Sequence, residues 1–224
     1  RDDVESRGLG DVYKRQIFFG LDRKNDYYAE NIQNNADGGV LADLCFGDTK
    51  LSVKIPAIGS YMVSNALAAV AVGKLCGLND EQLIKGVQAY KTVGSRANVI
   101  NTEDYKIIDD CYNANPTSVM ASIDTLVNFS GRTVAILGDM KELGTNELEM
   151  HRKTGEHAKE KGVDLVIAVG PLAKALAEGS GGKWYADIDS LLPDLKSLLK
   201  KGDTVLVKAS HSMQFERIVA FLKG

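Results

Sequence analysis

The second half of the chain alternates short, wholly apolar runs with longer amphipathic segments. Runs such as 134–137 and 165–169 lack apolar–polar alternation, which is typical of strands buried on both faces. The pattern predicts strands at 106–109, 133–137, 165–169, 183–185 and 204–208, and helices near 116–128, 146–161, 171–178, 188–200 and 213–222. Five βα units with short connections predict an α/β fold with a Rossmann-like, doubly wound parallel sheet.

The first half shows a different pattern. Residues 17–56 predict short strands, including a hairpin with one buried face that turns at Gly47 and Asp48. Two helices follow, one crowded with small residues from Ile58 onward and one capped by Asn79. Residues 91–98 (KTVGSRAN) form a polar linker, so we predict domains at 17–92 and 93–224.

The first sixteen residues, RDDVESRGLGDVYKRQ, are charged, lack periodicity and end abruptly against apolar residues. We expect residues 1–16 to be a non-native or disordered extension and leave them out of the fold.

Composition narrows the function classes. The 224 residues are 44% hydrophobic and 25% charged, with a net charge of −3, so non-specific binding to nucleic acid or to an anionic membrane is not expected. No apolar run approaches the ~20 residues of a membrane span. Three widely spaced cysteines favour neither a disulfide framework nor a metal site. We expect a cytoplasmic protein that acts as a monomer.

Polar side chains gather where the predicted strands end. Asp109 and Asp110 open a loop that closes at Asn115, where the side chain can cap a helix starting at Pro116. Other loops at this edge are 138–144, 170–171 and 209–212. Because ligands bind at the carboxyl ends of parallel strands, this edge would suit a zwitterion or a peptide terminus. The alternative is a well-capped βα turn with two solvated aspartates.

Two further polar residues have open roles. Asn65, in the small-residue helix, either bonds a nearby carbonyl or faces a ligand. Arg96, in the linker, is either solvated or a phosphate clamp.

Several motifs are absent from the sequence. There is no G-x-x-x-x-G-K-[ST] phosphate loop and no G-x-G-x-x-G, and the three histidines lack metal-ligand spacing.

These pieces resemble a known family. The motifs DDCYNANP, LGDMKELG, IGSYMVSNALAAVAVG, GSRAN and VLVKAS are together similar to those of the ATP-dependent Mur ligases, from about Ile17 to the C-terminus. The resemblance implies a chain that supplies the tail of a central ATPase domain and a complete C-terminal Rossmann-like domain. It also implies ATP and Mg²⁺ as cofactors, with the phosphate loop and the magnesium ligands in a part that this sequence lacks.

Family roles transfer to individual positions. Asn65 matches an asparagine that contacts adenine, Arg96 an arginine that reaches the nucleotide phosphates, and Asp110 an aspartate that holds the ribose. Arg96 and Lys208 are the candidate catalytic residues. The positions that would line the acceptor side are Asn113, Asn115, Asp139, Glu142, His151, Lys208 and Ser210. Tyr61 stands where the family has histidine, and His211 where it more often has arginine.

The resemblance is strongest to the members that join D-Ala-D-Ala to UDP-N-acetylmuramoyl-tripeptide. It implies activation of the tripeptide carboxylate as an acyl phosphate, attack by the dipeptide amine and release of phosphate, with domain closure about Gly94. We expect the chain to be inactive alone. The alternatives are another Mur ligase, a folylpolyglutamate synthase relative, or a non-catalytic small-molecule-binding module.

Overall fold

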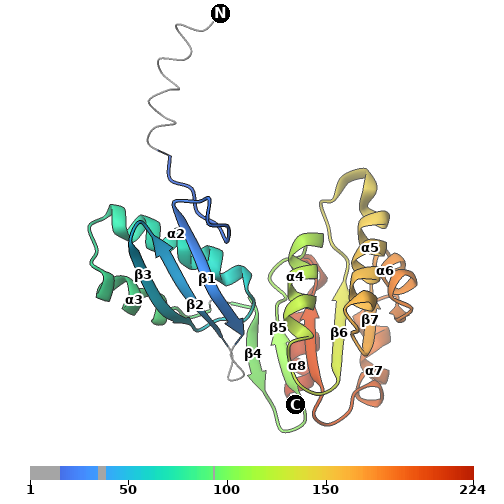
Figure 1. Ribbon diagram of the computed structural model, residues 1–224. Helices are drawn as coiled ribbons and strands as arrows, with labels where there is room; N and C mark the ends of the chain where they lie inside the picture. The colour runs from blue at the N-terminus through green and yellow to red at the C-terminus, as the bar shows by residue number, and fades with distance from the viewer. Residues whose placement is uncertain (1–15, 35–38, 93) are drawn as a thin grey trace, which may run out of the picture. The chain divides into compact units, whose positions relative to one another are not determined.

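The computed structural model describes residues 16–34, 39–92 and 94–224, which form two compact units (Figure 1). Described residues up to Pro56, together with Ser60–Tyr90, form the first unit, and Ala57–Gly59 with Lys91–Gly224 form the second. The predicted extension 1–16 lies outside the described residues except for Gln16, and residue 93 at the predicted domain boundary is also outside them. Over the described part of the chain, none of the helices has the length and apolar character needed to cross a bilayer.

The first unit is a three-stranded antiparallel sheet with two helices. Its elements are β1 (Tyr27–Asn34), β2 (Val40–Phe46), β3 (Thr49–Ile55), α2 (Tyr61–Leu75) and α3 (Asp80–Gln88), and the strand order is β1-β2-β3. The predicted hairpin is confirmed, because Phe46 pairs with Thr49 across the two-residue turn. Asn79 caps α3 as predicted, with its side chain accepting the Gln82 N–H at 2.9 Å. Leu83 and Val87 bury the inner side of this helix.

A polar cluster lies on the side of this sheet to which Asp43 points. Asp43 alternates with the buried Ala42 and Leu44 along β2. Its carboxylate accepts hydrogen bonds from Ser52 Oγ and Asn31 Nδ2, each at 2.6 Å, and pairs with Lys50 Nζ at 2.9 Å. These hydrogen bonds, with Ser52 contributing most, lower the pKa of Asp43 to about 2.

The second unit is a six-stranded sheet. Its strands are β4 (Asn98–Asn101), β5 (Lys106–Asp109), β6 (Thr133–Gly138), β7 (Leu165–Val169), β8 (Lys183–Tyr185) and β9 (Thr204–Lys208), in the order β4-β5-β9-β6-β7-β8. The five predicted strands are present and pair in parallel. The sheet also has a strand that the sequence analysis missed, since β4 pairs antiparallel with β5 and begins at Asn98, the last residue of the predicted linker.

Helices cover both faces of this sheet, as a doubly wound fold requires. They are α4 (Pro116–Leu126), α5 (Glu147–Glu160), α6 (Ala173–Ser180), α7 (Ile188–Leu198) and α8 (Glu216–Lys223). Buried residues of α4, α5 and α6 pack in one core cluster, and those of α7 and α8 pack in the other. The helices that follow β5 and β6 lie on one face of the sheet, whereas the helix that follows β9, the strand between them, lies on the other face. The carboxyl end of β9 therefore lies at a switch point of the sheet.

Glycines allow α5 and α6 to approach closely. A Cβ on Gly155 would lie 2.1 Å from the carbonyl oxygen of Leu176, and one on Gly179 would lie 2.3 Å from that of Arg152. Both distances are far below van der Waals contact, and both involve backbone atoms that cannot turn aside. The two helices therefore pack backbone to backbone.

Replacing a glycine at this crossing should separate the helices. We expect Gly155→Ala to lower the free energy of unfolding by about 1–3 kcal/mol, because the new methyl group overpacks the contact. Gly86→Ala is the matched control, since its Cβ would meet nothing within 4 Å on helix α3. The control should raise stability by about 0.5–1 kcal/mol through helix propensity. Urea unfolding followed by circular dichroism measures both, and equal stabilisation by both variants would contradict the close packing.

Because of the Asp43 cluster, we expect the first unit to lose stability in acid. Because the pKa of Asp43 is lowered on folding, its stabilising contribution is present above about pH 4 and is lost as the pH falls toward 2. Asp43→Asn should therefore be less stable than the parent chain at pH 7, and the difference should vanish near pH 2. Thermal unfolding of both chains between pH 7 and pH 2 tests this, and a difference independent of pH would argue against the assignment.

Candidate functional site

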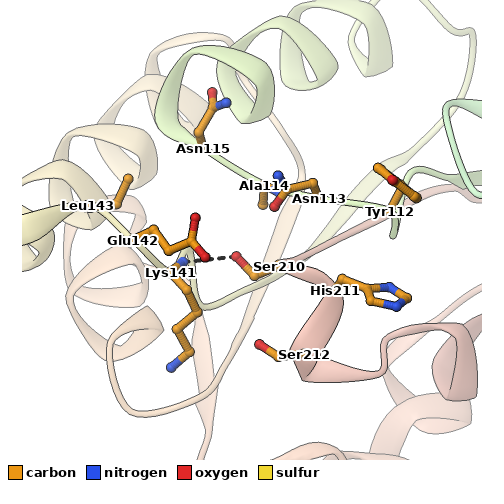
Figure 2. Close-up of a pocket in the computed structure, with 10 residues that line it drawn as sticks. All are labelled: Tyr112, Asn113, Ala114, Asn115, Lys141, Glu142, Leu143, Ser210, His211 and Ser212. Atoms are coloured by element: carbon orange, nitrogen blue, oxygen red, sulfur yellow. Dashed lines mark hydrogen bonds between the residues drawn. The ribbon is translucent and has the colours of Figure 1, made fainter.

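Three loops of the second unit enclose a pocket at the carboxyl ends of neighbouring strands (Figure 2). Because β9 lies between β5 and β6, the loops that follow these three strands meet at one edge of the sheet. The pocket has a volume of about 590 Å³, which is within the usual range for small-molecule sites. It is lined by Tyr112, Asn113, Ala114, Asn115, Lys141, Glu142, Leu143, Ser210, His211 and Ser212.

A buried ion pair joins the end of β9 to the loop after β5. Lys208 Nζ donates to Asp110 Oδ2 at 2.6 Å and to the carbonyl oxygen of Asn113 at 2.9 Å. Ser122 Oγ, from α4, donates to the same Asp110 oxygen at 2.8 Å. The side chains of Lys208 and Asp110 are only 4% and 11% exposed, so each charge is balanced by the other inside the protein.

The loop after β6 is fastened to its surroundings through Asp139. This residue is fully buried, and its Oδ1 accepts the N–H groups of Leu172 and Ala173 at the start of α6, at 3.0 and 2.8 Å. Its Oδ2 pairs with Lys141 Nζ at 2.8 Å. The positive end of the α6 dipole and the Lys141 ammonium together balance the Asp139 carboxylate.

Ser210 links this loop to the end of β9. Its backbone N–H donates to the carbonyl oxygen of Asp139 at 3.1 Å, and its Oγ accepts the Lys141 N–H at 2.9 Å, the bond drawn dashed in Figure 2. Because Oγ acts as an acceptor here, the hydroxyl hydrogen stays available to a ligand.

His151 lies beneath the same loop with no exposed surface. Its Nε2 accepts the Met140 N–H at 2.9 Å, and its Nδ1 lies 2.6 Å from the carbonyl oxygen of Glu147. These contacts require a neutral ring that carries its hydrogen on Nδ1. The structure therefore does not bring His151 or Asp139 to the pocket wall, where the resemblance placed them. Both instead hold the loop that bears Lys141 and Glu142.

Glu142 is the free carboxylate among the residues that line the pocket. It is exposed, and no hydrogen bond or ion pair joins it to the residues that the structure describes. Its φ of +64° is unusual for a residue other than glycine and is often found at functional sites. Asn115 contributes a partly used amide, because Oδ1 caps α4 by accepting the Ser118 N–H at 2.8 Å.

The remaining predicted residues lie outside the pocket lining. Arg96 is exposed, and its guanidinium carbon lies 3.9 Å from the ring centroid of Tyr112, which does line the pocket. Asn65 belongs to the first unit, where it is exposed on α2 with its Nδ2 3.4 Å from the sulfur of Met62.

Cys111, in the loop after β5, is a buried thiol that stays protonated at neutral pH. Burial raises its pKa well above the ordinary value, and the negative charge of Asp109 raises it further. Asp109 is itself buried, and its Oδ1 has no hydrogen-bond partner among the described residues. A thiolate nucleophile at this position is therefore disfavoured.

The described residues fit the two implied cofactors differently. Arg96 makes no hydrogen bond or ion pair with described residues, so its N–H groups are available to a phosphate. Asp110 is largely occupied, since besides Lys208 and Ser122 it accepts the Ala97 N–H on Oδ1 at 3.1 Å. For Mg²⁺, the ranges that the structure describes contain no group of three His, Cys, Asp or Glu residues that could hold a metal ion.

Sequence reasoning missed two residues of this region as site candidates. Lys141 lies between Asp139 and Glu142, so its position in a loop at the edge of the sheet was a usable signal. Tyr112 is half exposed, and an aromatic side chain in an otherwise polar loop was a second signal.

Two parts of the chain match known protein families. Residues 95–211 match the family described as Mur ligase, glutamate ligase domain, and residues 2–73 match the Mur ligase middle domain. The UDP-N-acetylmuramoyl-tripeptide--D-alanyl-D-alanine ligase of Bacillus subtilis is 32% identical over 211 residues, which cover 90% of this chain and 46% of the relative.

Solved structures give the same result. A crystal structure of MurF from Acinetobacter baumannii has a TM-score of 0.88 at 29% identity, covering 100% of this chain and 50% of that one. MurF ligase from Thermotoga maritima, solved in complex with ADP, has a TM-score of 0.82 at 28% identity over 99% of this chain and 51% of that one. The chain spans about half the length of the proteins it matches. From the matches of residues 95–211 and 2–73 and from the similarity of its sequence and fold, the chain belongs to the Mur ligase family.

Proposed function

We propose that this chain supplies the acceptor side of an ATP-dependent ligase that forms a peptide bond between UDP-N-acetylmuramoyl-tripeptide and D-Ala-D-Ala, a step of peptidoglycan precursor synthesis. The observation that carries the proposal is the pocket at the ends of β5, β9 and β6, where a free carboxylate, an ammonium, hydroxyls and amides surround one space. The relatives at about 32% identity are named for this reaction, which supports the choice of substrates.

The charges of the pocket match those of a zwitterionic dipeptide. Glu142 would accept hydrogen bonds from the dipeptide ammonium, because it has no partner among the described residues. Lys141 and the Ser210 hydroxyl would donate to the carboxylate end. Lys141 pairs with Asp139 but stays 41% exposed, so it can still turn N–H groups toward a ligand.

In this proposal Arg96 contacts the phosphate groups of ATP. Its free N–H groups would donate to phosphate oxygens, which orients the phosphate and stabilises negative charge. ATP, when bound, supplies the phosphoryl group that activates the tripeptide carboxylate. Holding the dipeptide amine close to that carboxylate is the contribution of the pocket, and positioning of this kind is a major source of rate enhancement.

Asp110 and Lys208 act differently in this proposal. Both are buried and paired with each other, so we propose that they position the loop after β5 instead of reacting with substrate. We also propose a cytoplasmic, monomeric protein, and the three free cysteines, two of them buried, support a reducing compartment.

Dipeptide binding tests the pocket. D-Ala-D-Ala should bind the chain, and Glu142→Gln should weaken binding about two- to fivefold, because the variant loses one exposed ion pair without a change of shape. Glu160→Gln is the matched control, since it removes the same charge from an exposed position at the end of α5. Isothermal titration calorimetry measures the three affinities.

A blocked ligand sharpens this test. N-acetyl-D-Ala-D-Ala lacks the ammonium, so the parent chain and Glu142→Gln should bind it equally. Tighter binding of D-Glu or diaminopimelate would instead favour another Mur ligase or a folylpolyglutamate synthase relative. Tight binding of an unrelated metabolite with no response to D-Ala-D-Ala would favour a non-catalytic module.

Turnover by the chain alone should be at background. The sequence holds no phosphate loop, so the backbone N–H groups and the lysine with which such a loop holds the phosphates of ATP are missing. Phosphate release is measured with ATP, Mg²⁺, UDP-N-acetylmuramoyl-tripeptide and D-Ala-D-Ala, with a sample lacking D-Ala-D-Ala as the control. Dipeptide-dependent release above that control would overturn the expectation of inactivity.

A further inference from the structure

Arg96 rests on an aromatic ring. Its guanidinium carbon lies 3.9 Å from the ring centroid of Tyr112, within the range of a cation–π contact, and both residues belong to the second unit. Both side chains are exposed, and Arg96 forms no hydrogen bond or ion pair with described residues. The ring is therefore the partner that the structure gives this cation.

The backbone around Arg96 is held in place on both sides. The carbonyl oxygen of Ser95 accepts the Tyr112 N–H at 3.0 Å, and the Ala97 N–H donates to Asp110 Oδ1 at 3.1 Å. Ala97 has a φ of +53°, a left-handed conformation that alanine rarely adopts without such restraint. The segment 95–97 is thus fastened to the loop after β5, and the Arg96 side chain leaves from a fixed point.

A guanidinium that lies over an aromatic ring can still donate hydrogen bonds through its N–H groups. The guanidinium lies over the Tyr112 ring, and none of its N–H groups donates to a described residue. These groups lie in the plane of the cation and can bind an oxyanion with two parallel hydrogen bonds. The ring also limits the rotamers of a long side chain, which lowers the entropy lost when a ligand binds. Tyr112 can do this through its ring alone, without its hydroxyl.

We propose that Tyr112 is a positioning residue that presents the edge of the Arg96 guanidinium to a phosphate oxyanion. The inference rests on the proposed function, in which Arg96 contacts phosphate, and adds the residue that places it. His211 borders the same ring, with the two ring centroids 6.1 Å apart and the planes tilted by 36°. The Tyr112 ring therefore lies between Arg96, which is always charged, and His211.

A double-mutant cycle tests the coupling. The ligand is inorganic tripolyphosphate, titrated at low salt into the 224-residue chain and followed by calorimetry. Tyr112→Leu should weaken binding about two- to fivefold, the usual size of an exposed cation–π contact, and Tyr112→Phe should bind like the parent. In an Arg96→Ala background, Tyr112→Leu should have no further effect. Tyr90→Leu, at another exposed tyrosine, is the control and should change nothing.

Two results would overturn the inference. If Tyr112→Phe weakens binding as much as Tyr112→Leu, the hydroxyl of Tyr112 supports binding and the contact of its ring with Arg96 does not. If the losses from Tyr112→Leu and Arg96→Ala add in the double variant, the two residues act independently.

A spectroscopic readout separates this inference from the proposed function. The ring should shift the δ protons of Arg96 upfield in the NMR spectrum of the parent chain and of Tyr112→Phe, but not of Tyr112→Leu. Absence of the shift, with binding still lost in Arg96→Ala, rejects the positioning role and leaves the phosphate contact intact. A shift that is present while Arg96→Ala binds normally rejects the phosphate contact itself, and with it the role proposed for Tyr112.

Discussion

The ion pair between Lys208 and Asp110 joins the segments from which the pocket is built. Removing two charges from water costs several kcal/mol per ion, and the cost is offset only where further hydrogen bonds satisfy both groups. Here Asn113 and Ser122 complete the set, and the Ala97 N–H adds a contact from the linker. One buried cluster therefore fixes the end of β9, the loop after β5, helix α4 and the segment that carries Arg96.

Buried polar groups also fix the loop after β6. Asp139, in this loop, accepts the first N–H groups of α6, and His151, from α5, accepts the N–H of Met140 in the loop. Among the residues that line the pocket, Glu142 has a carboxylate with no hydrogen-bond or ion-pair partner in the described part of the chain. Asp139 and His151 therefore build this site, whereas Glu142 can meet a ligand, although the resemblance placed all three on the acceptor side.

The elements could be predicted from the sequence, but their order in the sheet could not. Buried β-branched runs and the Asn115–Pro116 cap define strands and helices locally, and those predictions agree with the structure. Strand β4 was missed because three of its four residues are only half-buried, the fourth is exposed, and an asparagine stands at each end. The contact between Lys208 and Asp110 joins residues 98 positions apart and depends on β9 lying beside β5, which periodicity does not report. The edge that bears the site was therefore predictable, but not which polar residues face inward.

The glycine crossing of α5 and α6 has a consequence for how the pocket receives a ligand. Because these helices pack backbone to backbone and each anchors the loop after β6, the backbone of the wall that carries Lys141 and Glu142 is held in place. The opposite wall consists of the exposed side chains of Tyr112, His211 and Ser212, and the Tyr112 ring lies against Arg96 and His211. An incoming molecule therefore meets a fixed backbone on one side of the pocket, and the entropic cost of its capture falls on the exposed side chains of both walls.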